Sequence, residues 1–256
     1  MGLSAWKLAG NNRWALRNNP SSGNLHPTES YLITSGINNI VAGVYHYHSY
    51  LHCLEQRCTF ESPPAAESFL IGLSSIHWRE AWKYGERAFR YCQHDIGHAI
   101  ATFSYAAATL GWQVEVLDRC SDEHIDSLLG LNRQVDFNGA EHEKADVLIQ
   151  IHTRPEQQAV NIDDLISCAQ QGYWQGQANC LSPEPHINWP LIDDISNTCV
   201  KPQTESLHWQ PPQLPELSAC TSTAHATTII QQRRSAQAFD GISTLPLHDF
   251  YRMLDC

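Results

Sequence analysis

The chain has 256 residues and a formal net charge of -11, and 42% of its residues are hydrophobic and 17% charged. This composition is typical of a globular protein of one large or two small domains, and no stretch approaches the ~20 consecutive apolar residues of a membrane helix. The acidic balance argues against nucleic acid as a partner, because only 16 Lys and Arg are spread along the chain. The first residues carry no export or anchoring signal. We therefore expect a soluble, cytoplasmic protein that binds neither nucleic acid nor membrane.

The first predicted strand follows a polar turn. Residues 20–27 read Pro-Ser-Ser-Gly-Asn-Leu-His-Pro, and the apolar run 31–34 comes shortly after them. Gly23 allows the backbone to approach a ligand, and the short polar side chains around it can hold the edge or the phosphate of a flat cofactor. Those side chains belong to Ser21, Ser22 and Asn24. The alternative is an ordinary turn before a strand, since the same residue types dominate turns without ligands.

A hairpin and a long helix are the clearest elements in the middle of the chain. Alternating bulky and polar residues at 44–48 and a second run at 51–54 predict the hairpin. Residues 69–73 predict either a buried strand or a short helix, which their period does not distinguish. From residue 86 to residue 110, apolar residues recur three or four apart and predict a long central helix that Gly111 ends.

Three more elements follow before residue 153. The pattern predicts a strand at 113–117, a helix at 122–129 that Ser121 caps, and a strand at 146–151. Hairpins and crossovers are mixed in this order of elements. We therefore expect an α+β fold with a central mixed or antiparallel sheet and helices on its faces.

Residues 153–224 differ from the part before them. They hold eight of the thirteen prolines and few long apolar runs, so we interpret them as a connector with an amphipathic helix at 161–172. The segment 227–232 leads into Arg233-Arg234-Ser235, and a helix is predicted to start at 247–254, so we expect another domain to begin here. The predicted domains are 1–152, 153–224 and 225–256.

The nine cysteines are scattered and include no Cys-x-x-Cys pair. Cys53 and Cys58 are the closest two, and no second pair completes a zinc ligand set. No local signature singles out one thiol as a nucleophile. We interpret all nine as reduced thiols without a catalytic role.

His94 and His98 offer a metal-based alternative. They stand at i and i+4 of the predicted long helix, a usable metal-ligand spacing, and the dipeptide His94-Asp95 is similar to that of metal-dependent phosphohydrolases. Such an enzyme needs another His and a distant Asp, and the candidates, His77 and residues 141–143, have no suitable spacing. The other interpretation is that these histidines only pack on the helix.

Motifs of other enzyme classes are missing from the sequence. It has no Gly-x-Ser-x-Gly turn of a serine hydrolase, no Walker loop and no Gly-x-Gly-x-x-Gly turn. In contrast, Arg233-Arg234-Ser235 places guanidinium groups and a hydroxyl near a helix end, which suits a phosphate. The alternative is a solvated basic helix end.

Three motifs, taken jointly, are specific. They are Arg17-x-x-Pro20-Ser21-Ser22-Gly23-Asn24-x-x-Pro27-x-Glu29-x-Tyr31, then Gly43-Val44-Tyr45-His46-Tyr47, and the helix from Glu86-Arg87-Ala88-Phe89-Arg90-Tyr91 through Gly97-His98 to Ala106-Ala107-Ala108-Thr109-Leu110-Gly111. With them, residues 10–152 resemble the FMN-dependent nitroreductase family, and more closely its SagB-type branch of flavoprotein dehydrogenases associated with azoline oxidation. The resemblance implies a nitroreductase-like three-layer fold, FMN sites at a dimer interface and hydride transfer through flavin N5. We also expect a small-molecule substrate and an electron donor such as NAD(P)H.

The resemblance also implies which residues bind the cofactor. The family's opening motif, Arg-x-Ser-x-[Arg/Lys], is missing before residue 17 and is matched near the other end of the chain. We therefore expect a tandem protein, truncated at both ends, whose two segments share a flavin in a homodimer or an intramolecular pseudo-dimer. The expected FMN-binding residues are Arg17, Pro20, Ser21, Ser22, Gly23, Asn24, Arg233, Ser235 and Gln237.

Two departures from the family bear on activity. Gln237 stands where the family has a cation that stabilises the reduced flavin, and most of the second domain is not in this chain. The sequence predicts no catalytic side chain, because the flavin carries the chemistry. The leading hypothesis is an FMN-dependent oxidoreductase, or the larger part of one. The second is a flavin-free interaction or scaffold domain that has lost its catalytic half.

Overall fold

The structure is a computed structural model that describes residues 3–37, 39–65, 67, 69–157, 159–180, 187–206, 213, 222–233 and 236–254. The chain forms two compact units, Met1–Ser206 and Leu207–Cys256. The predicted division into 1–152, 153–224 and 225–256 stays a prediction, since a compact unit is not by itself a domain of a family.

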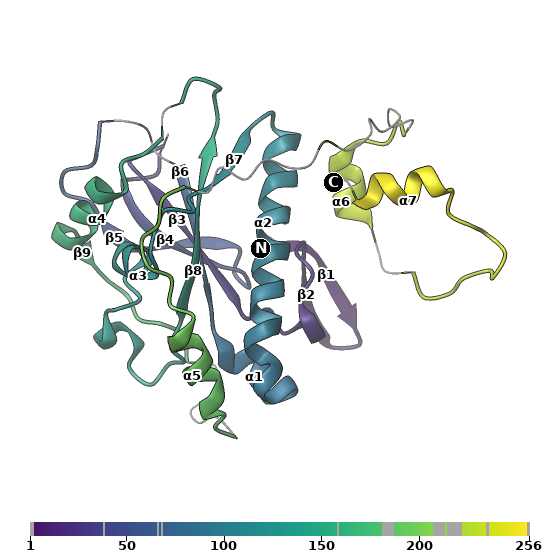
Figure 1. Ribbon diagram of the computed structural model, residues 1–256, viewed down its shortest axis with the longest axis horizontal. Helices are drawn as coiled ribbons and strands as arrows, with labels where there is room; N and C mark the ends of the chain where they lie inside the picture. Colours follow the sequence, from purple (N-terminus) through teal and green to yellow (C-terminus); the bar gives the residue numbers. More distant parts are fainter. Residues whose placement is uncertain are drawn as a thin grey trace. The chain divides into compact units, whose positions relative to one another are not determined.

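The first unit is built on a seven-stranded sheet (Figure 1). Every described strand pair in it is antiparallel, so of the mixed and antiparallel sheets expected from the sequence the antiparallel one is present. In spatial order, the strands are β7 (Gln113–Val116), β8 (Lys144–His152), β6 (Phe69–Ser75), β3 (Thr28–Thr34), β4 (Gly43–His48), β5 (Cys53–Thr59) and β9 (Tyr173–Trp174).

Strand β3 lies at the centre of this sheet, between β6 and β4, and all seven of its residues are buried. Because side chains alternate along a strand, its two faces enter two different cores. Ile33 packs with Leu70, and Leu32 packs with Ile71 on the opposite face. Because both faces are buried, the apolar residues at 31–34 follow one another instead of alternating with polar residues.

Helices cover both faces of the sheet and complete a three-layer arrangement. Helix α2 (Ala88–Thr109) packs against the face that carries Leu32, through Ile96 and Ala99. Helices α3 (Asp122–Leu129) and α4 (Ile162–Gln171) pack against the other face, through Leu128 and Leu165. The predicted fold class, α+β with a long central helix, is confirmed.

Several predicted boundaries agree with the structure and others move. Helix α3 begins and ends as predicted, and the Ser121 hydroxyl caps it by accepting a hydrogen bond from the His124 backbone N–H at 3.1 Å. The ambiguous segment 69–73 is a strand, β6. The second hairpin strand begins at Cys53 rather than at residue 51, because the turn extends to His52, which has a φ of 52°.

The sequence patterns did not predict five further elements of the first unit. A separate hairpin precedes the polar turn, and a short helix follows β6. These elements are β1 (Leu3–Ala9), β2 (Asn12–Arg17), α1 (His77–Tyr84), α5 (Pro190–Thr198) and the two-residue strand β9. There are also three short 3-10 helices, η1 (Ser22–Asn24), η2 (Gly85–Arg87) and η3 (Gln134–Phe137).

The described residues of the second unit form helices α6 (Ala226–Gln232), which was not predicted, and α7 (Leu247–Leu254), which has the predicted bounds. None of its described residues is buried. Phe239 is 87% exposed and Ile242 is 84% exposed, so this unit has no core of its own within the described residues. In the described part of the whole chain, no helix is both long and apolar enough to cross a bilayer.

Candidate functional site

The segment Pro20 to Pro27, which we call the polar turn, has a fixed and unusual backbone. It is closed by hydrogen bonds from the Asn24 N–H to the Ser21 carbonyl at 3.1 Å and from the Leu25 N–H to the Ser22 carbonyl at 3.3 Å. The Ser21 hydroxyl accepts a further bond from the His26 N–H at 2.8 Å. Residues 23, 24 and 26 all have φ between 53° and 61°. Consecutive left-handed residues are uncommon outside glycine, so this conformation is held by its surroundings.

The long helix α2 anchors the polar turn through a hydrogen bond. The Ser22 backbone N–H donates to Asp95 Oδ1 at 3.2 Å, and Asp95 is fully buried. On the other side of the turn, Asn24 uses its side-chain oxygen to bind His26 Nε2 at 3.1 Å. Its amide NH₂ group has no partner among the described residues and is available to donate to a ligand.

Lys83 and Tyr84, at the end of α1, border the polar turn at Gly23. A Cβ placed on Gly23 would lie 2.7 Å from Lys83 Nζ and 2.7 Å from the Tyr84 hydroxyl oxygen. Glycine, with a φ of 60°, therefore permits both the backbone conformation and this close approach. The Tyr84 ring packs against Tyr91 with the ring centroids 4.5 Å apart. The turn thus meets a cation and an aromatic pair that come from α1 and α2.

Two carboxyl groups lie buried near the polar turn, on α1 and α2. Glu80 and Asp95 are both fully buried, and neither oxygen of Glu80 has a hydrogen-bond partner among the described residues. Burial and the neighbouring Asp95 raise the pKa of Glu80 to about 7. Burial also raises the pKa of Asp95, although hydrogen bonds from Ser21 and Ser22 oppose the shift. Near pH 7 the Glu80 carboxyl is therefore about half protonated.

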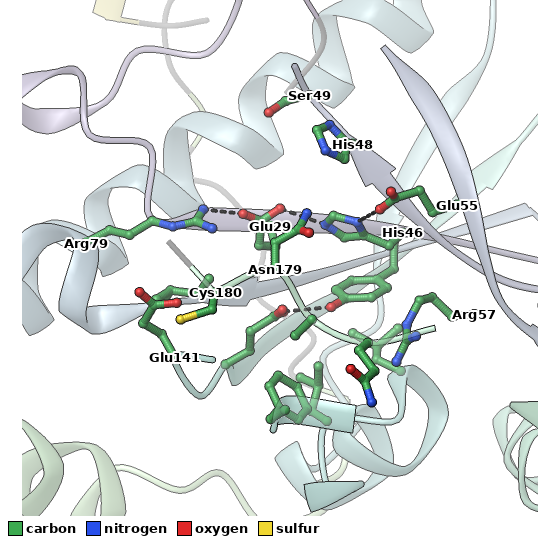
Figure 2. A pocket seen from close by; sticks show the side chains of 18 of the residues that line it. Glu29, His46, His48, Ser49, Glu55, Arg57, Arg79, Glu141, Asn179 and Cys180 are labelled. Carbon is green, nitrogen blue, oxygen red and sulfur yellow. Dashed lines mark hydrogen bonds and ion pairs between the residues drawn. The ribbon is translucent and has the colours of Figure 1, made fainter. Parts of the chain in front are cut away.

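A cavity of about 590 Å³ opens beside the polar turn (Figure 2). Arg17 and Leu25 line it from the turn side, Trp78, Arg79 and Trp82 from α1, and residues 177–180 from the connector. Its floor is formed by side chains of three adjacent strands. These are Glu29 and Tyr31 of β3, His46 and His48 of β4, and Glu55 and Arg57 of β5.

Four charged side chains form a continuous chain of ion pairs across this cavity. Arg79 pairs with Glu29, whose second oxygen is 2.8 Å from His46 Nε2, and His46 Nδ1 is 2.9 Å from Glu55 (Figure 2). Burial acts to raise the pKa of Glu29, but His46 and Arg79 outweigh it and lower the pKa to about 2. Burial acts to lower the pKa of His46, but Glu29 and Glu55 raise it to about 9. At neutral pH Glu29 and His46 are therefore both charged.

A second buried group lies beside this chain. Glu143 accepts hydrogen bonds from the Tyr31 hydroxyl at 2.8 Å and from the Ser74 hydroxyl at 2.5 Å. Burial, reinforced by the charge of Glu29, raises the pKa of Glu143, and burial also raises that of Tyr31. These groups form a fixed polar floor.

The expected cofactor residues divide between the two units. Arg17 and residues 20–24 lie close together in the first unit, whereas Arg233 and Gln237 are exposed in the second. Arg234 and Ser235 lie outside the described residues. Whether the two groups meet across one flavin stays a prediction.

The metal alternative has no support in the described part of the chain. No group of three or more His, Cys, Asp and Glu side chains is arranged there to hold a metal ion. His94 and His98 are both exposed on α2, and His98 Nδ1 lies 3.8 Å from Asp95 Oδ1. In this region, the pair has the placement expected of surface histidines.

A search of solved structures identifies the fold. A structure from Anabaena variabilis, provisionally classed as a nitroreductase, matches this chain with a TM-score of 0.61 and 20% identity, over 94% of this chain and 51% of that one. The chain has a nitroreductase-like fold. It spans about half the length of the Anabaena protein.

Two other solved structures are less similar to the chain. One is the E. coli microcin synthetase McbBCD complex with truncated pro-MccB17 bound, at a TM-score of 0.44 and 20% identity over 59% of this chain and 57% of that one. The other, from Ralstonia eutropha and also provisionally classed as a nitroreductase, has a TM-score of 0.41 and 16% identity over 57% and 64%. The chain matches no protein-family profile and no curated protein.

Sequence reasoning missed the side chains that α1 contributes. Lys83, Arg79 and the two tryptophans of this helix were not predicted, because residues 77–84 carry no capping side chain and only two buried positions after His77. The available signal was their amphipathic spacing. The side of α1 opposite its buried residues carries the side chains that approach the turn and the cavity.

Proposed function

We propose that this chain is part of an FMN-dependent oxidoreductase of the nitroreductase type, and that the polar turn with Lys83 forms one side of its flavin site. The observation that carries the proposal is the approach of the Lys83 ammonium and the Tyr84 hydroxyl to the bare backbone of Gly23. This contact places a cation, Lys83, beside the turn whose sequence resembles the flavin-binding family, and the sequence motif does not include this lysine.

The residues present fit an FMN molecule. A flavin offers hydrogen-bond acceptors along the edge of a flat ring, and the site offers the Asn24 amide NH₂ group and the Lys83 ammonium as donors. The Tyr84 and Tyr91 pair supplies flat apolar surface beside these donors. The donor set and the small residues of the turn agree with a planar, electron-rich ligand.

When bound, FMN supplies hydride transfer through its N5 atom, and the protein supplies binding and electrostatics. In the proposed site Lys83 would supply a positive charge to stabilise the reduced flavin, which would offset the neutral Gln237. Asp95 holds the Ser22 backbone, so the turn keeps its shape without a ligand. Asn24 would donate a hydrogen bond to the flavin through its amide group.

The remaining parts of the proposal rest on the sequence resemblance. We infer SagB-type dehydrogenation of a small molecule, with an electron donor or acceptor such as NAD(P)H. Arg233, Ser235 and Gln237 are proposed to bind the flavin phosphate and ring edge from the other side of a homodimer or pseudo-dimer interface. The sequence-based prediction that Arg17 also binds FMN stays a prediction, and Arg17 is not part of the proposed flavin site, because it lines the cavity beside the turn.

Titration with FMN tests this function. The purified protein should absorb in the visible flavin band, or bind FMN when titrated, with quenching of flavin fluorescence. Lys83→Gln should weaken FMN binding about tenfold, equivalent to about 1.4 kcal/mol, and should make the bound flavin harder to reduce. Arg90→Gln, which removes an exposed cation elsewhere on the same unit, is the matched control and should bind as the unchanged protein does.

The outcomes separate the two hypotheses from the sequence. A colourless protein that does not bind FMN at any concentration tested would leave the scaffold hypothesis and refute the oxidoreductase. Unchanged FMN affinity and reduction potential in Lys83→Gln would show that this lysine is not part of the site.

A further inference from the structure

The cavity beside the polar turn has the features of a ligand site in its own right. Its volume of about 590 Å³ falls within the roughly 300–1,000 Å³ of small-molecule pockets. All its lining residues belong to the first unit, so its description does not depend on how the two units are arranged. We propose that it binds a small organic monocarboxylate with a flat apolar body, at a site separate from the flavin.

Arg17 provides the first argument, because its charge is not neutralised by a direct contact. In the part of the chain that the structure describes, its guanidinium makes no hydrogen bond and no ion pair. It lies near Glu29 and Arg79, and burial lowers its pKa from the ordinary value. A guanidinium stays protonated under physiological conditions and offers a planar pair of donors that matches a carboxylate.

The other charged groups of the cavity are already paired. Glu29 lies between Arg79 and His46, and Glu55 binds the far side of His46. Arg57 pairs with Asp136 at 3.1 Å. Each of these groups has an oppositely charged partner in contact, although Arg57 shares Asp136 with Arg133. Arg17 has no such contact among the described residues, so a ligand can supply its counter-charge.

The acidic groups of the cavity limit the charge of that ligand. Glu143 is fully enclosed and hydrogen-bonded, and Glu141 also lines the cavity, near Cys180 in Figure 2. The Glu141 carboxylate therefore adds a negative background to the cavity. A single negative charge can approach Arg17 against this background more easily than the double charge of a phosphate monoester, because like charges repel at short range. The balance favours a carboxylate.

The tryptophans of α1 provide the apolar part of the site. Trp78 and Trp82 are four residues apart on one face of the helix, and both line the cavity with Leu25. Trp82 is 60% exposed, which is unusual because most tryptophan side chains are largely buried. Indole rings beside a guanidinium suit an aromatic or flat apolar acid, whose ring covers the indole while its carboxylate reaches Arg17.

Calorimetric titration of the whole chain with phenylacetate tests the proposal. Phenylacetate should bind with one site per chain. Phenylacetamide, which has the same shape without the charge, should bind at least about tenfold more weakly, a difference of about 1.4 kcal/mol. Phenyl phosphate should also bind more weakly than phenylacetate. Equal affinity for the amide, tighter binding of the phosphate, or no binding of phenylacetate at millimolar concentration would each overturn the proposal.

Variants connect the binding to named side chains. Arg17→Gln should weaken phenylacetate binding at least about tenfold, whereas Arg13→Gln, an exposed arginine on the same strand, should not change it. Trp82→Ala, at an exposed position, should weaken binding several-fold and tests the site if Arg17→Gln does not fold. Unchanged affinity in a folded Arg17→Gln or in Trp82→Ala would refute the site.

A competition experiment separates this site from the flavin site. Saturating FMN should leave phenylacetate binding in place, because the two ligands use different groups. Displacement of phenylacetate by FMN would show that the carboxylate occupies the flavin site and would overturn the second site. If the chain binds no FMN, the proposed function fails, but the phenylacetate titration still decides the carboxylate site.

Discussion

The polar turn and the cavity beside it are neighbours that are built in opposite ways. The turn consists of eight consecutive residues, and its shape comes from local hydrogen bonds and from backbone torsions that only a few residue types adopt readily. The charged chain of the cavity takes Glu29, His46, Glu55 and Arg79 from four different elements. A substitution in the turn should therefore act locally, whereas one in the charged chain should affect several elements together.

Sheet register places the charged side chains of the cavity. Tyr31 pairs with His46 across β3 and β4, and His46 pairs with Glu55 across β4 and β5. Glu29 is two residues before Tyr31 and therefore projects from the same face. A shift of one residue in either pairing would move these side chains to the opposite face. The cavity depends on the register of three strands, whereas the turn combines local hydrogen bonds with one long-range bond, from Ser22 to Asp95.

The largest effect should come from Glu29→Gln. This change removes the buried carboxylate that lies between Arg79 and His46 and leaves these two partly buried cations without their shared counter-charge. Loss of one partner of a buried ion pair typically costs about 3–5 kcal/mol of stability. Urea unfolding at neutral pH measures it.

The matched control for Glu29→Gln is Glu55→Gln, at the more exposed end of the same chain. The side chain of Glu55 is 41% exposed, so its removal should cost less than about 1 kcal/mol. Equal losses of stability in the two variants would show that the buried Glu29 carboxylate stabilises the protein no more than the exposed Glu55 carboxylate does.

His46 should give the unfolding free energy a pH dependence. Its folded-state pKa is raised from 6.5 to about 9, so its contribution is fully present below pH 6.5 and is lost as the pH rises through 9. The difference in unfolding free energy between the unchanged protein and His46→Gln should fall by about 3 kcal/mol across this range. Denaturant titrations at several pH values measure it.

For this pH dependence the control is His94→Gln, which removes an exposed histidine of α2. It should leave the pH profile of stability close to that of the unchanged protein. If the stability of His46→Gln varied with pH as it does in the unchanged protein and in His94→Gln, the ion pairs assigned to His46 would be contradicted.

The smallest effect should come from Gly23→Ala in the polar turn. Its φ of 60° costs a side-chain-bearing residue about 1 kcal/mol, and the new methyl group must displace the ends of Lys83 and Tyr84. Gly10→Ala is the matched control, because Gly10 has a φ of 59° and open space around its Cα.

Comparison of the two glycine variants isolates the effect of the contacts. Thermal or urea unfolding should give similar losses, since the displaced atoms are the ends of flexible side chains. FMN affinity should fall only in Gly23→Ala. Equal FMN affinity in both variants would show that the contact between Lys83 and the turn does not contribute to FMN binding.

The fold class was predictable because its strongest signals are periodic. The spacing of Cys92, Ile96 and Ala99 predicts α2, and each of them is buried as that spacing requires. Helix α3 has its Ser121 cap and ends at Gly130, which has a φ of 73°. In contrast, α1 begins after Ile76 without a side-chain cap, and tertiary packing decides its existence. The hairpin of β1 and β2 also gave no clear signal.

The candidate site was only partly predictable, for the same physical reason. The polar turn is contiguous in sequence, so its residue types could be interpreted directly. Lys83 and Arg79 approach the site only because α1 packs beside the turn, and Asp95 supports the turn from a position 73 residues after Ser22. Contacts at this separation depend on the whole fold, and a single sequence carries no local trace of them.

The two-residue strand β9 has a consequence for how copies of this chain behave in solution. It pairs with Cys58 and Thr59 and so covers one end of β5, which would otherwise be an open edge of the sheet. Open edges expose unpaired backbone N–H and C=O groups that can recruit a strand from another molecule. By occupying these groups, a short piece of the connector limits the edge on which copies of the chain could aggregate.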